Sequence, residues 1–174
     1  MIGSKALASA KSDGYTIGQI PISVTRFSQL GILQADPRKD FTYIARTSGQ
    51  TFGIAVKAEA PWKTLKDFVA AAKAQPGRLT YGSAGIGGAT HVGMEEFAMT
   101  AGVQFNHIPY KGGAPALQDL LGGQIDALAD SSSLAPHVKS GKLRLLATWG
   151  EKRTQDFPEV PTLRDQGFDV VVDA

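Results

Sequence analysis

The chain has 174 residues, of which 43% are hydrophobic and 20% are charged, and its formal net charge is +2. These values are typical of an ordinary globular protein and exclude a disordered or fibrous chain. No basic run could follow a phosphate backbone, which argues against nucleic-acid binding. The absence of cysteine removes disulfides, thiolate-metal sites and cysteine nucleophiles. No apolar stretch approaches the roughly 20 residues that span a bilayer, so we expect a soluble protein.

The first 57 residues are predicted to be less regular than the remainder. We expect a helix near residues 2–10, and a turn at residues 12–14 that leads into a strand from Tyr15. Further strands are expected at residues 41–47 and 52–57. These strands predict part of a second sheet.

An amphipathic helix is predicted to follow Thr64. Apolar residues recur there at positions i, i+3, i+4 and i+7, namely Leu65, Phe68, Val69 and Ala72. Thr64 and Asp67 have the spacing of a capping box, and a Pro-Gly pair at residues 76–77 ends the helix. The sequence therefore gives both ends of this helix.

Strands and helices are predicted to alternate over residues 63–148. The expected strands are residues 78–83, 104–108, 124–129 and 143–148. The first helix between them has a buried stripe of Met94, Phe97, Ala98 and Ala101 and is expected to end at Gly102. Two further helices are expected at residues 114–121 and 131–140. This alternation predicts a parallel sheet with right-handed crossovers. A short helix near residues 161–166 and an apolar strand at residues 168–172 are expected to follow.

A glycine-rich bend at residues 81–91 (YGSAGIGGATH) is the strongest candidate for a binding site. Gly85, Gly87 and Gly88 lead from a strand into a helix, so backbone amides and the positive end of a helix dipole are available to an anion. The hydroxyls of Ser83 and Thr90 could add hydrogen bonds. A tight packing turn is the alternative, and the sequence leaves both interpretations open.

Two enzyme motifs come near to this segment, and both fail on spacing. A dinucleotide fingerprint would need glycine where Thr90 stands, and a nucleophile elbow would need glycine where Tyr81 stands. A hydrolase that used Ser83 would also need a base and an oxyanion hole. His91, His107 and His137 are too scattered for a metal motif, and we expect each to be a surface or capping residue, so no catalytic residue, metal or cofactor is predicted.

Two more bends lead from strands into predicted helices, at residues 108–114 (IPYKGGA) and 129–133 (ADSSS). In an open α/β sheet, ligands bind beyond the carboxyl ends of the strands. We therefore expect the loops that open at Ser83, Pro109 and Asp130 to lie side by side at one sheet edge, with three helix N-termini facing one crevice.

The residues of several segments point to a family. YGSAGIGGATH, HIPYKGGAPALQDLLGGQIDA, HVKSGKLRLLA and FPEVPTLRDQGF stand in the order and spacing of the tripartite tricarboxylate transporter solute receptors, the Bug-type family, which the chain resembles over nearly its whole length. The resemblance implies an α/β, two-lobed fold of the periplasmic-binding-protein type (type II). It also implies a small carboxylate, held largely by backbone amides and waters and delivered to a membrane permease, with no cofactor and no enzymatic activity.

The resemblance also implies a set of ligand-binding residues. One lobe would contribute Ser83, Ala84, Gly85, Gly87, Gly88, Thr90, Pro109, Tyr110, Gly112, Gly113, Asp130 and Ser131. The opposing lobe would contribute Pro21 and Ser23. A ligand-sensing or interaction module of the same fold, without a transport role, is the alternative function.

Relatives in this family usually have a signal peptide, a first strand with a glycine-containing loop, and several tens of further residues at the C-terminus. We therefore expect residues 1–57 and 150–174 to form an incomplete first lobe of a truncated receptor, and residues 58–149 a whole second lobe. A homodimer that pairs through residues 168–172 would cover the exposed edges. The family is periplasmic, but residues 1–10 lack the apolar core of a signal peptide, which leaves the cytoplasm as an alternative.

Overall fold

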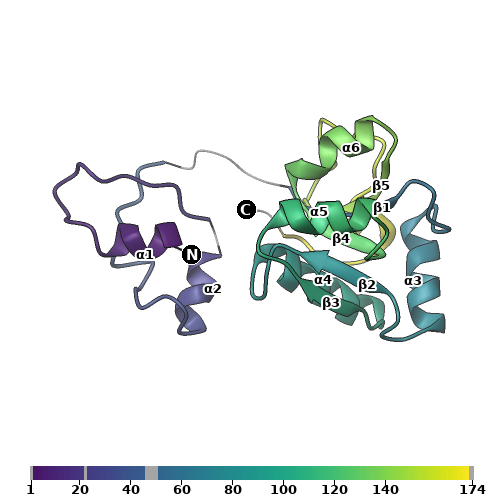
Figure 1. The fold of residues 1–174 in the computed structure, drawn as a ribbon, viewed down its shortest axis with the longest axis horizontal. Helices are drawn as coiled ribbons and strands as arrows, with labels where there is room; N and C mark the ends of the chain where they lie inside the picture. The colour runs from purple at the N-terminus through teal and green to yellow at the C-terminus, as the bar shows by residue number, and fades with distance from the viewer. Residues whose placement is uncertain (1, 22, 46–50, 173–174) are drawn as a thin grey trace. The chain divides into compact units, whose positions relative to one another are not determined.

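The computed structural model describes residues 2–21, 23–45 and 51–172, and the chain falls into two compact units (Figure 1). One unit comprises residues 1–49 together with residue 174, and the other comprises residues 50–173. Among the described residues, no helix has both the length and the apolar character needed to cross a membrane. Each unit is described by itself below.

The first unit contains two short helices, α1 (Ile2–Ala8) and α2 (Val24–Gln29), joined by turns and irregular segments. The predicted N-terminal helix is confirmed, but the strand expected from Tyr15 does not form. Residues 41–45 are irregular as well, and the remainder of the strand expected at 41–47 lies outside the described residues. Tyr15 and Ile17 are 93% and 77% exposed, and an extended segment without a neighbouring strand has no ladder of hydrogen bonds to stabilise it.

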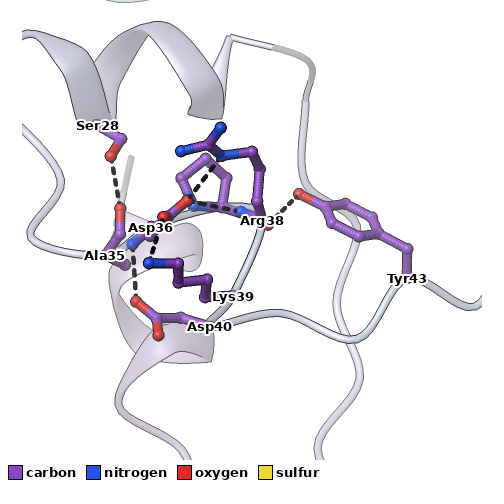
Figure 2. Close-up of polar contacts among 8 residues, drawn as sticks. Ser28, Ala35, Asp36, Arg38, Lys39, Asp40 and Tyr43 are labelled. Carbon is purple, nitrogen blue, oxygen red and sulfur yellow. Dashed lines mark hydrogen bonds and ion pairs between the residues drawn. The ribbon is translucent and has the colours of Figure 1, made fainter.

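A polar turn around Asp36 organises the end of the first unit (Figure 2). The Asp36 amide donates to Oδ2 of Asp40 at 2.7 Å, and Oδ1 of Asp36 accepts from the Arg38 amide at 2.9 Å. The Tyr43 hydroxyl donates to the Pro37 carbonyl at 2.9 Å. The bond from the Arg38 amide holds the pKa of Asp36 below its usual value. All these contacts join residues that are close in sequence.

The second unit is built on a five-stranded sheet with the order β3-β2-β4-β1-β5 (Figure 1). The strands are β1 (Gly53–Lys57), β2 (Thr80–Ser83), β3 (Asn106–Pro109), β4 (Ala127–Asp130) and β5 (Leu143–Thr148). Strand β2 pairs in parallel with β3 and β4, whereas β1 pairs antiparallel with β4 and β5. The four strands predicted for residues 63–148 run parallel to one another, as expected, but β1 lies antiparallel between β4 and β5, so the sheet as a whole is mixed.

Strand β1 also lies in a different part of the molecule from the one expected. The sequence analysis assigned it to the first lobe, but Gly53 pairs with both Asp130 and Thr148, so β1 lies inside the sheet of the second unit. Residues 150–172 belong to this unit too, which begins at residue 50 and not at residue 58. A strand buried on both faces is apolar throughout, and that pattern encodes neither its direction nor its partners.

Six helical segments accompany the sheet. They are α3 (Leu65–Ala74), α4 (Ala89–Ala101), α5 (Gly113–Leu121), η1 (Ser132–Leu134), α6 (Ala135–Lys139) and η2 (Arg164–Gln166). The helix expected at residues 131–140 is divided into η1 and α6. Pro136 has no N–H to donate to an upstream carbonyl, so the helix that contains it cannot extend back through Ser132 without loss of a hydrogen bond.

The predictions for α3 and α4 are confirmed in detail. Thr64 and Asp67 form the reciprocal capping box, in which each amide donates to the other side chain, at 2.9 and 3.1 Å. Hydrogen bonding by the Thr64 side chain, followed by that of the Thr64 amide, lowers the pKa of Asp67. All eight apolar positions named for the two helices are buried. Gly102 ends α4 with φ 64°, in the left-handed region that glycine adopts without strain.

The C-terminal segment packs into its own unit. Val170 and Val172 are buried, and the Val172 amide donates to the Trp149 carbonyl at 2.9 Å. The segment has no regular strand, so the strand predicted at residues 168–172 is wrong, because its apolar side chains fill the core beside Trp149 without entering the sheet. The apolar pattern of residues 168–172 therefore reflects burial in the core and not pairing with another strand.

Candidate functional site

Three loops meet at one edge of the sheet in the second unit. Ser83 lies opposite Pro109 in the parallel pair β2–β3, and Gly82 lies opposite Leu128 in the parallel pair β2–β4. The three strands thus run in the same direction and end together, as Figure 1 shows. The prediction that the loops opening at Ser83, Pro109 and Asp130 lie side by side is confirmed.

The first bend turns β2 into α4 through glycines that adopt left-handed backbone conformations. Gly85 has φ 135° and Gly87 has φ 75°, and Gly88 then precedes the helix. A side chain at Gly85 or Gly87 would strain the backbone. A Cβ atom at Gly85 would also lie 3.4 Å from the Tyr110 carbonyl, so the first bend approaches the second.

The second bend turns β3 into α5 and lies against the third. Gly112 has φ 115°, and Gly113 is the first residue of α5. A Cβ atom at Gly113 would collide with the carboxylate of Asp130, whose Cγ it would approach to 3.1 Å. Asp130 itself is buried, and it accepts hydrogen bonds from the Ser131 amide at 2.8 Å and the Ser133 hydroxyl at 2.7 Å.

Two of the three bends open regular helices of useful length. The first-turn N–H groups of α4, with 13 residues, and α5, with nine, have no acceptor within their own helix and carry the positive end of the dipole. The third bend opens the single turn of η1 instead, so the expectation of three helix N-termini is wrong. The edge therefore combines two amide-rich helix starts with one buried carboxylate, that of Asp130.

The side chain of Ser83 is committed to the bend itself. It is fully buried, its Oγ accepts from the Gly85 amide at 3.3 Å, and Oγ lies 2.7 Å from Nε2 of His107. A serine beside a histidine is half of a nucleophilic pair, but a nucleophile must reach its substrate and this hydroxyl is enclosed. Thr90 is buried as well, whereas Ala84 is exposed, so the groups this bend offers to a ligand are chiefly backbone groups.

Two histidines meet beneath the first bend, which sequence spacing did not reveal. The rings of His91 and His107 lie 4.2 Å apart, and Tyr81 stacks on the other side of His107 at 4.7 Å. Nδ1 of His91 accepts from the Gly87 amide at 3.3 Å. His91 has a capping contact at the start of α4, as expected, but the contact between the two rings was not predicted, because the parallel pairing of β2 and β3 and the start of α4 bring them together.

Burial and neighbouring charges shape the titration of this cluster. Burial lowers the pKa of His107, the nearby His91 lowers it further, and Glu95 opposes both. Burial raises the pKa of Tyr81, and so does the hydrogen bond from its hydroxyl to Glu95 at 2.7 Å. Among residues 2–21, 23–45 and 51–172, no three histidine, aspartate or glutamate side chains are grouped so that they could hold a metal ion.

Tyr110 and the residues expected from the other lobe complete the predicted set. The Tyr110 hydroxyl donates to Oδ2 of Asp119 at 2.6 Å, and burial together with this bond raises its pKa to about 12. Pro21 and Ser23 belong to the first unit, where Pro21 is exposed and Ser23 is buried before α2. Their role as ligand contacts stays a prediction.

Comparisons with known proteins find matches over almost the whole chain. The family described as "Tripartite tricarboxylate transporter family receptor" matches residues 1–173. A Cupriavidus necator relative, described as the UPF0065 protein in the gbd 5' region, is 47% identical over 171 residues, which cover 98% of this chain and 52% of that protein. The chain thus spans about half the length of the curated relatives it matches.

Two solved structures show the same fold. One, described as a periplasmic transporter, has a TM-score of 0.89 and 36% identity, and the match covers 96% of this chain and 57% of that one. The other is MatC from Rhodopseudomonas palustris with bound malate, with a TM-score of 0.85 and 25% identity, covering 99% of this chain and 60% of that one. The predicted fold class, α/β of the periplasmic-binding-protein type, is confirmed.

Proposed function

Since the chain belongs to the tripartite tricarboxylate transporter receptor family, we propose that it holds a small carboxylate at the loop edge of its second unit. This is a family of solute-binding receptors and not of enzymes. The observation that carries the proposal is the meeting of two glycine-lined bends, each of which opens a helix, at the ends of parallel strands. Such an edge is where open α/β sheets bind ligands.

The chemistry of this edge favours a carboxylate. Each carboxylate oxygen can accept backbone N–H bonds, and the first turns of α4 and α5 supply such donors with a favourable dipole. The glycines at Gly87 and Gly112 allow the ligand to approach the backbone closely, because no Cβ intervenes. Lys111 lies exposed in the second bend and adds a positive charge near the second helix start.

The side chain of Asp130 limits which carboxylate ligands suit this edge. Its negative charge disfavours a second carboxylate directly beside it, while an acceptor oxygen suits a hydroxyl or a bridging water. The malate in the MatC neighbour is a hydroxy acid of this kind. We therefore take a small dicarboxylate that carries a hydroxyl, with malate first, as the leading candidate.

The proposal extends to the partners of a transport receptor. By resemblance to the family, the proposal includes delivery of the ligand to a membrane permease from the periplasm and a contribution from Pro21 and Ser23 to ligand binding. A homodimer is part of the proposal too, but residues 168–172 no longer support it, because they pack within their own unit. It rests on the exposed apolar side chains of Tyr15, Ile17 and Ile44. Light scattering behind a sizing column tests it, and a stable monomer at micromolar concentration would contradict it.

A thermal-shift screen against mono-, di- and tricarboxylates, malate included, tests the binding proposal. A ligand present at 100 times its dissociation constant stabilises the folded protein by about 2.7 kcal/mol. We expect malate or a related hydroxy acid to raise the melting temperature. No shift with any acid of the panel would contradict the proposed function.

A pair of glycine variants locates the site. Gly87→Val places a β-branched residue at φ 75° in the first bend, and Gly141→Val does the same at φ 72° after α6, outside the three bends. Both variants should destabilise the protein by roughly similar amounts, because both strain the backbone. Only Gly87→Val should also abolish the ligand-induced shift. Equal ligand responses in the two variants would show that the first bend is a packing turn.

A further inference from the structure

The hydrogen bond between Gly87 and His91 fixes the protonation state of the His91 ring. A backbone N–H can only donate, so Nδ1 of His91, 3.3 Å from the Gly87 amide, must present its lone pair. An Nδ1 atom that accepts this bond carries no proton. Gly87 is buried and left-handed, so this bond contributes to the shape of the bend at its most constrained point.

His107 supports the same bend from its other end. Its Nε2 lies 2.7 Å from the hydroxyl of Ser83, which in turn accepts from the Gly85 amide. With the two rings 4.2 Å apart, the pair contacts the bend at Ser83 through one ring and at Gly87 through the other. The residues between these contacts, 84–88, are the amide-rich stretch of the proposed ligand site.

Acid should disturb this support at the hydrogen bond between the Gly87 amide and His91. Protonated at Nδ1, the ring loses the lone pair that the Gly87 amide needs. His91 is also the third residue of α4, where a positive charge opposes the helix dipole. A charged His91 would lie against His107, and the other ionisable groups facing the pair are Glu95 and Tyr81, which bond to one another.

We propose that His91 and His107 are positioning residues that hold residues 83–88 in a ligand-ready shape only while His91 is neutral, so that acid releases the bend and weakens carboxylate binding. This inference rests on the proposed function, because it assigns a proton-linked control to the same site.

The first test follows the bend without any ligand. Proton–nitrogen NMR spectra of the full chain are recorded from about pH 8 to pH 5, with ring carbon signals of the three histidines in the same samples. We expect the Gly87 amide signal to move with the midpoint of His91 and not with that of His137, which lies in α6 outside the pair. A Gly87 signal that does not follow His91 would overturn the proposal.

The second test compares malate affinity at about pH 7.5 and about pH 5 in variants of His91. Asn places an oxygen acceptor near the Nδ1 position but does not titrate, whereas Phe keeps a ring without an acceptor. We expect the wild type to bind roughly tenfold more weakly at the lower pH. His91→Phe should bind roughly tenfold more weakly than the wild type at the higher pH, because a buried amide loses its partner. His91→Asn should recover most of that loss and show little pH dependence.

The controls separate the possible failures. Protonation of malate itself affects every variant equally, so the comparison between the wild type and His91→Asn isolates the protein. His137→Asn should retain the pH dependence of the wild type. Circular dichroism at each pH reports whether a variant is folded, and if His91→Phe unfolds, His91→Asn and the NMR titration decide. If no acid of the panel binds, the proposed function fails, whereas the titration of the Gly87 amide signal is measured without ligand and tests the inference separately. An unchanged pH dependence in His91→Asn would overturn the inference.

Discussion

The two units of the chain treat their large apolar side chains in opposite ways. In the second unit, Tyr81, Phe97 and Trp149 are completely buried. In the first unit, Tyr15 and Ile17 stand almost fully in solvent. Because burial of apolar surface is the main favourable term in folding, the second unit has an extensive core of its own, whereas the buried apolar side chains described in the first unit are those of Val24 and Leu33.

Polar contacts repeat this difference. The Asp36 turn of the first unit bonds residues two to four positions apart. In the second unit, the Thr80 amide and hydroxyl both donate to Oδ2 of Asp126 at 2.8 Å, across 46 positions of sequence. The Asp126 amide donates back to the Thr80 hydroxyl at 3.0 Å. Bonds of this kind fix the position of β2 relative to β4, the two strands that lead into the first and third bends.

The largest expected effect is the removal of a core side chain. Trp149→Ala should lower the free energy of unfolding by about 3–5 kcal/mol, because it leaves a large cavity beside Gly93 and Val172. The matched variant of the first unit, Tyr15→Ala, should change it by less than about 0.5 kcal/mol, since that ring is exposed. Urea denaturation measures both. Similar decreases in the free energy of unfolding in the two variants would show that the difference in burial does not affect stability.

A second pair of variants sharpens the comparison at glycines. Gly113→Ala should cost about 1–3 kcal/mol, because its Cβ would collide with the Asp130 carboxylate. Gly3→Ala in α1 meets nothing within 4 Å and should stabilise the helix by about 0.5–1 kcal/mol. Denaturant midpoints measure both effects. Adding Asp130→Ala to Gly113→Ala should recover part of the loss, and strict additivity of the two changes would contradict a direct collision.

The half-buried phenol of Tyr110, at the loop edge, gives a smaller, pH-dependent effect on stability. Tyr110 has a pKa raised from 10.0 to about 12 in the folded protein. The unfolded chain therefore loses this proton first, so the stability due to Tyr110 is present below pH 10 and is lost as the pH rises through about 12. We expect about 1 kcal/mol, less than the shift alone implies because water reaches part of the ring. Stability of the wild type and of Tyr110→Phe, measured between pH 9 and pH 12, gives this difference. Tyr43→Phe, from the first unit, is the control that should not reduce the alkaline fall.

The two units should not differ in how much their exposed ion pairs contribute to stability. Arg164 pairs with Asp169 at 2.8 Å in the second unit, and Arg38 pairs with Asp36 at 3.4 Å in the first. The Arg38 side chain is largely exposed and that of Arg164 is about half exposed. Arg164→Ala and Arg38→Ala should each leave the melting temperature close to that of the wild type, because water and salt screen such pairs. A clear loss in one variant alone would mean that its pair belongs to a more cooperative network.

Much of the second unit could be predicted from its sequence. The capping box at Thr64 and Asp67, the buried stripe of α4 and the left-handed Gly102 are all local patterns, and all appear in the structure. The position of the candidate site followed from three strand-to-bend patterns. In the first unit the same reasoning failed at Tyr15, since a strand exists only where another strand is available to pair with it.

The sequence by itself determined α3 with its ends, the buried stripe and C-terminal end of α4, and the glycine bends, because capping, periodicity and backbone freedom act within a few residues. Only the tertiary structure decided that β1 enters the sheet antiparallel beside β4, and that the C-terminal apolar run fills the core. The tertiary structure also brought His91 and His107 into contact beneath the first bend. The direction of a strand, its partner strands and the contacts between side chains depend on segments that are far apart in the chain. A pattern of apolar and polar residues along the chain does not encode which distant segment will be the neighbour.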